Sequence, residues 1–85
     1  MKAKRIVYKN KPIYLPFQVS LPEDPTAAEI VKNRFGGESC TLPAFAVAVY
    51  DVIMGSEMLQ DWKSHRQGLD WFIKYFPKQY MVLLD

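Results

Sequence analysis

TLPAFAVAVYDVIMGSEMLQ, residues 41–60, is the most apolar and most helix-like stretch of the chain. Thr41 can cap a helix with its hydroxyl group, and Pro43 suits a first turn because that position needs no N–H donor. From Leu42 to Tyr50 the residues are apolar all round rather than along one stripe, which is typical of a helix that other elements cover. We therefore predict a central helix against which the rest of the chain packs.

Two short segments before this helix favour β-structure. Residues 3–9 (AKRIVYK) and 12–19 (PIYLPFQV) are rich in β-branched and aromatic residues, and Asn10-Lys11 between them can form a turn. The sequence therefore predicts an N-terminal β-hairpin within residues 1–19.

The next segment, TAAEIVKNRF at residues 26–35, favours a short helix. Its apolar residues fall at helical spacing, and Thr26 followed by Glu29 forms a capping-box pattern. Gly36-Gly37 would end the helix, with Gly36 suited to the left-handed position that follows a helix C-terminus.

Residues after the central helix predict two more helices, with a break between residues 60 and 64. Ser64 can cap a helix over residues 65–76, and Pro77 can end that helix and begin a last one. For residues 78–84 a strand beside the N-terminal hairpin is the alternative, because YMVLL is ambiguous by periodicity. We favour the helix.

Together these elements predict one α+β domain over residues 1–85. A basic β-hairpin (1–19) is followed by a helical body (26–85) of three to four short helices packed around one central helix. The predicted core consists of apolar residues from all the helices: Ile30, Phe35, Phe45, Val49, Ile53, Leu59, Leu69, Phe72, Ile73 and Leu83.

Positive charge is concentrated at the N-terminus. The first eleven residues contain no acidic residue but five basic ones: Lys2, Lys4, Arg5, Lys9 and Lys11. With Tyr8, Tyr14 and Phe17 interleaved, this segment could lie on nucleic acid, with cations on phosphates and rings on bases. The alternative is an ordinary strand whose lysines protect an exposed edge from aggregation.

The sequence offers no credible catalytic or metal-binding set. It has one cysteine, Cys40, and one histidine, His65, so neither an internal disulfide nor a soft metal site is expected. A helix N-terminus would lower the pKa of Cys40, but no histidine is near it in sequence, and His65 lies in a polar segment. We therefore expect no enzyme, no cofactor and no metal. The single cysteine favours a reducing cytoplasm. We also expect a soluble protein, because the longest apolar run is far shorter than the roughly 20 residues that span a bilayer.

The loop RFGGES, residues 34–39, is the first candidate for binding. Two glycines before a helix N-terminus could present N–H groups to an anion beside Arg34, although the loop lacks the Lys-Ser/Thr ending of a phosphate loop. The alternative is a simple turn in which Arg34 and Glu38 pair locally.

Interaction residues are expected on the loop and on the helices: Arg34, Glu38, Asp51, Gly55 and Trp71. Gly55 lies inside the central helix, where glycine costs about 1 kcal/mol and a packing or functional reason is worth seeking. We also predict at least one Arg–carboxylate pair between elements, with Arg34 and Asp51 as the first choice.

Three segments resemble small uncharacterised proteins of tailed bacteriophages, of the cyanophage and marine-phage type. They are RFGGES (34–39), AVYDVIMGSE (48–57) and GLDWFIKYFPKQYMVLLD (68–85), together 34 of the 85 residues. The resemblance implies a phage protein made in the cytoplasm of a bacterial host, and nothing about catalysis or a ligand. The basic N-terminal segment lies outside it.

Two functional hypotheses follow. The first is a non-enzymatic interaction module that binds a phage or host protein, or itself, through apolar surface that a short chain cannot fully cover. The alternative is nucleic-acid binding through the basic N-terminal hairpin.

Overall fold

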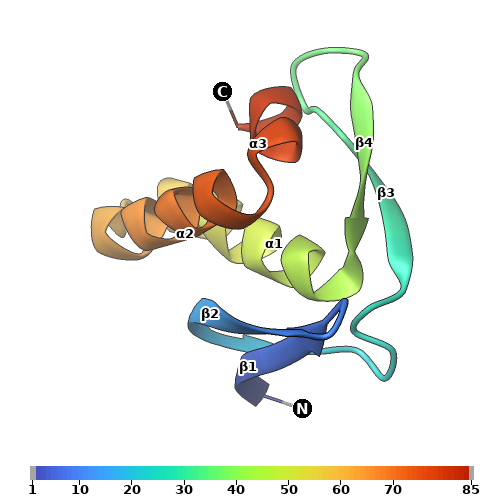
Figure 1. Ribbon diagram of the computed structural model, residues 1–85. Helices are drawn as coiled ribbons and strands as arrows, with labels where there is room; N and C mark the ends of the chain where they lie inside the picture. Colours follow the sequence, from blue (N-terminus) through green and yellow to red (C-terminus); the bar gives the residue numbers. More distant parts are fainter. Residues whose placement is uncertain (1, 85) are drawn as a thin grey trace.

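The computed structural model describes residues 2–84, and side chains from residue 4 to residue 84. Strands β1 (Lys2–Tyr8) and β2 (Lys11–Ser20) form one antiparallel hairpin, and β3 (Ala28–Lys32) and β4 (Ser39–Pro43) form a second. Helices α1 (Ala44–Met58), α2 (Trp62–Tyr75) and α3 (Pro77–Leu83) follow. In Figure 1, α1 lies above the β1–β2 hairpin, with α2 and α3 farther along the chain and the β3–β4 hairpin at the side. The protein is thus an α+β domain.

The predicted N-terminal hairpin is confirmed. Its two-residue turn is Lys9-Asn10, one position earlier than expected, and both residues have positive φ angles of 51° and 65°. Two adjacent positive φ angles are what a type I′ turn requires, and this turn matches the twist of the strands. One face of β2 buries Ile13, Leu15 and Val19 against the helices.

The helix predicted over residues 26–35 is wrong, because this segment contains β3. Ile30 and Val31 pair with Thr41 and Cys40 of β4, a contact between segments that no local pattern reveals. Thr26 does not cap a helix, since its hydroxyl donates to the Asp24 carboxylate at 3.2 Å. The helical body therefore contains three helices and a second hairpin in its described part.

Helix α1 begins at Ala44, not at Thr41, because Ser39–Pro43 belong to β4. No side chain caps the helix. Instead, the N–H of Phe45 donates to the carbonyl of Pro25, and that of Ala44 to the carbonyl of Ala27, both at 2.8 Å. These bonds satisfy two of the N–H groups that a helix start leaves without an internal partner.

The two C-terminal helices are confirmed, with a corrected start for the first. Asp61 rather than Ser64 caps α2, and its carboxylate accepts the backbone N–H of Ser64 at 3.2 Å. Pro77 begins α3, so residues 77–83 are helix and the alternative of a strand is wrong.

An aromatic cluster joins the hairpin to the helices. The ring of Phe45 is fully buried and contacts the rings of Tyr8, Trp71 and Phe76, with centroids 5.2, 6.3 and 6.0 Å away. Five of the predicted core residues are buried: Phe45, Val49, Ile53, Phe72 and Leu83. A sixth, Leu69, is partly buried. The other four are exposed, so their assignment to the core is wrong: Ile30, Phe35, Leu59 and Ile73.

Candidate functional site

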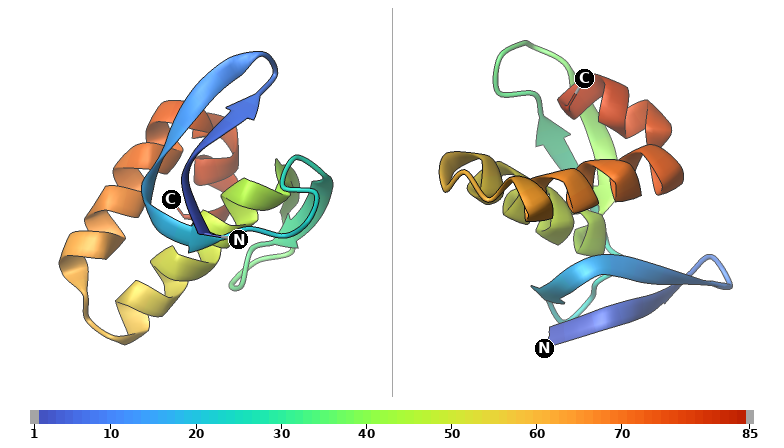
Figure 2. Two further views of the ribbon diagram at one scale, coloured as in Figure 1. Left: turned by 90° about the horizontal axis from the view of Figure 1, so that it is seen from below. Right: turned by 90° about the vertical axis from the view of Figure 1, so that its left-hand side faces the viewer.

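Three large apolar residues are exposed where α1 turns into α2: Met58, Leu59 and Trp62. Leu59 is 82% exposed and Trp62 57%. Gln60 between them has a φ of 59°, and Asp61 donates its N–H to the carbonyl of Ser56 at 2.8 Å, so the chain reverses sharply there. Figure 2 shows this connection at the end of the helix pair that is remote from β4. We call these three residues the apolar tip.

An open pocket of about 320 Å³ lies beside the same helices. Met54, Leu69, Leu83 and Leu84 give it an apolar wall, and its other lining residues are Asn33, Phe35, Glu57 and His65. The lining residues come from α1, α2, the C-terminal end of α3 and the β3–β4 loop. A pocket with this lining can accept an apolar side chain.

His65 joins the apolar tip to the pocket. Its ring contacts that of Trp62 edge to face, with centroids 5.6 Å apart, and it also lines the pocket. A hydrogen bond fixes the position of the His65 ring, because its Nδ1 lies 3.2 Å from the carbonyl oxygen of Ile53. Through His65, Trp62 of the apolar tip is connected to the pocket, which Phe35 also lines. We call the apolar tip, the pocket and Phe35 together the apolar surface.

The β3–β4 loop displays Phe35 in a defined position. The side-chain amide of Asn33 donates to the carbonyl of Val82 at 2.6 Å, which ties the loop to α3. The backbone N–H of Asn33 donates to the carbonyl of Glu38 at 2.8 Å and so joins the two ends of the loop. The N–H of Phe35 donates to the Asn33 side-chain oxygen at 2.7 Å, yet the phenyl ring is 94% exposed. The loop is thus anchored while its one aromatic side chain faces solvent.

The anion-binding hypothesis for this loop loses its basis. The loop leads into a strand, so the helix N-terminus expected directly after it is not there. Neither Gly36 nor Gly37 has a positive φ, so the expected left-handed conformation of Gly36 is wrong. The turn instead closes through the Asn33 hydrogen bonds.

The predicted interaction residues divide into two groups. Arg34 and Glu38 are exposed on the loop, and Asp51 is exposed on α1, one turn before Gly55. Trp71 is 6% exposed and its indole N–H donates to the carbonyl of Tyr14 at 2.8 Å. Trp71 therefore stabilises the core and is not available to a partner.

The predicted ion pair between Arg34 and Asp51 does not form. Arg34 is near enough to lower the pKa of Asp51, but partial burial has the larger effect and the pKa is raised. Among the described side chains the one ion pair is Arg66 with Asp70, 3.5 Å apart, within α2 rather than between elements. Such an exposed pair contributes at most about 0.5 kcal/mol.

Replacement of Asp51 by asparagine is expected to stabilise the protein slightly at neutral pH. The folded-state pKa of Asp51 lies above its ordinary value, so the folded chain binds this proton more tightly than the unfolded chain. The wild-type protein therefore loses stability as the pH rises from the ordinary pKa to the raised one, and Asp51→Asn avoids that loss. Urea midpoints should favour the variant at about pH 7 and converge at about pH 3. An equal difference at both pH values would contradict this assignment.

Cys40 is not at a helix start. It lies in β4 opposite Val31, and partial burial raises the pKa of its thiol. The expected activation by a helix N-terminus is therefore wrong, and the thiolate is disfavoured at neutral pH.

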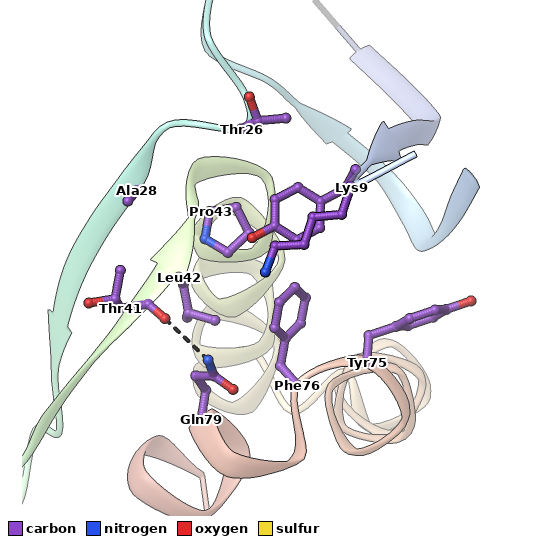
Figure 3. Close-up of a pocket in the computed structure, with 10 residues that line it drawn as sticks. Lys9, Thr26, Ala28, Thr41, Leu42, Pro43, Tyr75, Phe76 and Gln79 are labelled. Atoms are coloured by element: carbon purple, nitrogen blue, oxygen red, sulfur yellow. Dashed lines mark hydrogen bonds between the residues drawn. The ribbon is translucent and has the colours of Figure 1, made fainter. Parts of the chain in front are cut away.

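A second pocket, of about 340 Å³, lies between the β1–β2 turn, β4 and the junction of α2 with α3 (Figure 3). Gln79 donates a hydrogen bond to the carbonyl of Thr41 at its wall, at 3.3 Å. Lys9 is its one charged lining residue, and no acidic, histidine or cysteine side chain lines it. This lining offers no acid–base pair.

Comparison with known proteins adds no relative: no family model, no curated protein and no solved structure matches the chain. In the described residues, no helix is both long and apolar enough to cross a membrane, and no group of three or more acidic, histidine or cysteine side chains is placed to hold a metal ion. The function is therefore argued from the surfaces described above.

Proposed function

We propose that the protein is a small interaction module that binds a partner protein through the apolar surface. The observation that carries this proposal is Phe35, an aromatic residue that is 94% exposed on an anchored loop beside a pocket with an apolar wall. Exposed apolar areas that are contiguous mark interaction sites more often than singly exposed residues do.

The arrangement resembles the centre of a protein interface in its composition. Phe35 and Trp62 supply aromatic anchors, and such residues dominate binding energy when a partner covers them. The pocket between them can receive one large apolar side chain of the partner. Glu57 and Asp61 are exposed near the anchors and would lie at the rim, where they favour a partner with basic groups around an apolar centre.

The resemblance of residues 34–39, 48–57 and 68–85 to tailed-phage proteins supports a partner from the phage or its bacterial host, met in the host cytoplasm. All three segments contribute directly to the apolar surface, since they include Phe35, Met54 and Leu69 respectively. Association of two copies is the other form that binding through this surface can take.

Phe35→Ser and Trp62→Ser are expected to abolish partner capture from lysate of infected host cells. Loss of one aromatic anchor should cost about 2 kcal/mol or more, which is roughly a 30-fold loss of affinity. The matched control is Ile30→Ser, because Ile30 is 76% exposed but lies on β3, outside the apolar surface. Light scattering on the same proteins would detect self-association.

Two results would contradict the proposal. One is a monomeric protein that captures no partner. The other is capture that survives both Phe35→Ser and Trp62→Ser to the same extent as Ile30→Ser.

A further inference from the structure

The outer face of the β1–β2 hairpin carries an exposed tyrosine with an arginine as its cross-strand partner. Side chains alternate along β2, so Ile13 and Leu15 face the helices while Tyr14 between them is 63% exposed. Arg5 of β1 is the cross-strand partner of Tyr14, and the next outward pair is Val7 with Pro12. The Cβ atoms of such pairs stand about 5 Å apart on one face, so Arg5 and Tyr14 leave the sheet side by side.

The tyrosine is held from the inner side of the sheet. The buried indole of Trp71 donates its N–H to the carbonyl of Tyr14 at 2.8 Å, which fixes this point of β2 to α2. Figure 2 (left) shows the hairpin lying across the helices, so one of its faces is covered by them and the other is open. Tyr14 is therefore displayed on a strand whose backbone is anchored, and ordering it for binding costs little entropy.

The hairpin that carries Tyr14 is positively charged, and its described cations have no ion-pair partners. Residues 2–20 contain no Asp or Glu. The described cations of the hairpin are all exposed: Lys4, Arg5, Lys9 and Lys11. None of these four forms an ion pair, and the ammonium group of Lys9 lies 5.4 Å from the centre of the Tyr8 ring. Lys2 belongs to β1, but its side chain lies outside the described residues.

Protection of an open strand edge explains the lysines but not the aromatic ring. An edge needs charged groups along its rim, whereas Tyr14 stands on the open face with Arg5 beside it. A ring with a neighbouring arginine on a cationic hairpin is suited to a ligand that has both flat bases and phosphates. Stacking requires bases that are not paired within a duplex, which points to a single strand.

We infer that the hairpin binds single-stranded nucleic acid, with one base stacked on Tyr14 of its open face and phosphates held by Arg5 beside Tyr14 and by the exposed lysines of the same hairpin. The site is sequence-tolerant, because every base has a flat surface to stack. It shares no residue with the apolar surface, so each can be tested without the other.

Fluorescence anisotropy with a labelled strand of about 15 thymidines, at about 50 mM and about 200 mM salt, tests the inference. Three to four phosphate contacts predict a slope of log K against log salt of roughly −2 to −3. Tyr14→Ala should weaken binding at least about fivefold, whereas Tyr14→Trp, which keeps a stacking ring, should restore it.

A charge-matched pair separates the site from general basicity. Arg5→Gln with Lys11→Gln should weaken binding and reduce the slope by about 1.4, that is about 0.7 for each lost phosphate contact. Lys32→Gln with Lys78→Gln removes the same charge from exposed positions on β3 and α3, and should leave affinity nearly unchanged. Circular dichroism would confirm that every variant is folded.

Three outcomes would overturn the inference. The first is no binding by folded protein at the lower salt concentration. The second is affinity that Tyr14→Ala does not change, and the third is equal loss in the two charge-matched variants. Binding to a duplex of the same length as tightly as to the single strand would exclude stacking and also count against it.

Discussion

Replacement of Phe45 by alanine is expected to lower the free energy of unfolding by about 3–5 kcal/mol. The side chain is fully buried, and its ring contacts link β1, α1, α2 and the start of α3 in one cluster. Alanine would remove the buried ring and leave a cavity where no single neighbour can fill the space. Because small domains have a free energy of unfolding near 5 kcal/mol, most of the stability should be lost.

Phe35→Ala is the matched control for this prediction. Both positions lose a phenyl ring, but the ring of Phe35 faces solvent, so its loss should change stability by less than about 0.5 kcal/mol. Urea unfolding followed by tryptophan fluorescence would measure both. Similar midpoints for wild type and Phe45→Ala would show that the aromatic cluster is wrongly placed.

Gly68→Ala is expected to destabilise the protein by about 1–3 kcal/mol, although alanine favours helices. A Cβ atom at position 68 would lie 2.8 Å from Cδ1 of Ile53, closer still to Cγ1, and 3.5 Å from Cζ of Phe17. Ile53 is itself fully buried, so it has no free space into which it could move. The absence of a side chain at Gly68 is what allows α2 to approach α1.

Gly55→Ala supplies the control, since it makes the same change inside α1. Nothing lies within 4 Å of a Cβ built at Gly55, so the close packing expected from the sequence is not found there. The gain in helix propensity should then stabilise the protein by up to about 1 kcal/mol. Thermal melting should move in opposite directions for the two variants, by about 4–8 °C for each kcal/mol. Shifts of the same sign and size would contradict the packing described for Gly68.

Local sequence patterns predicted the elements whose stability is local. Alternating apolar residues and a short turn mark the β1–β2 hairpin, and Pro77 marks the boundary between α2 and α3. Residues 26–43 were misread because their structure depends on pairing between two segments, Ala28–Lys32 and Ser39–Pro43. The capping-box pattern at Thr26 and the apolar run that includes Leu42 are compatible with helix, and only the partner strand decides against it.

The candidate site was harder to predict than the fold. Phe35 and Leu59 were expected in the core because they are large and apolar. A side chain is buried only where another element packs against it, and no element covers either of these two residues. Trp71 was expected at a surface and is buried by the hairpin. The short run Met58, Leu59 and Trp62 around a polar turn was the one signal that could have indicated the apolar tip.

The hydrogen bonds from Ala44 and Phe45 to residues 27 and 25 also affect the order in which the chain can fold. The first turn of α1 is complete only when the segment before β3 has arrived, so the helix start and the β3–β4 hairpin should open and close as one cooperative unit. The remainder of α1 with α2 needs only contacts between neighbours in sequence and can form earlier. Transient opening of that unit would loosen the backbone at Phe45. A fully buried ring is thus attached to a segment whose structure depends on contacts distant in sequence.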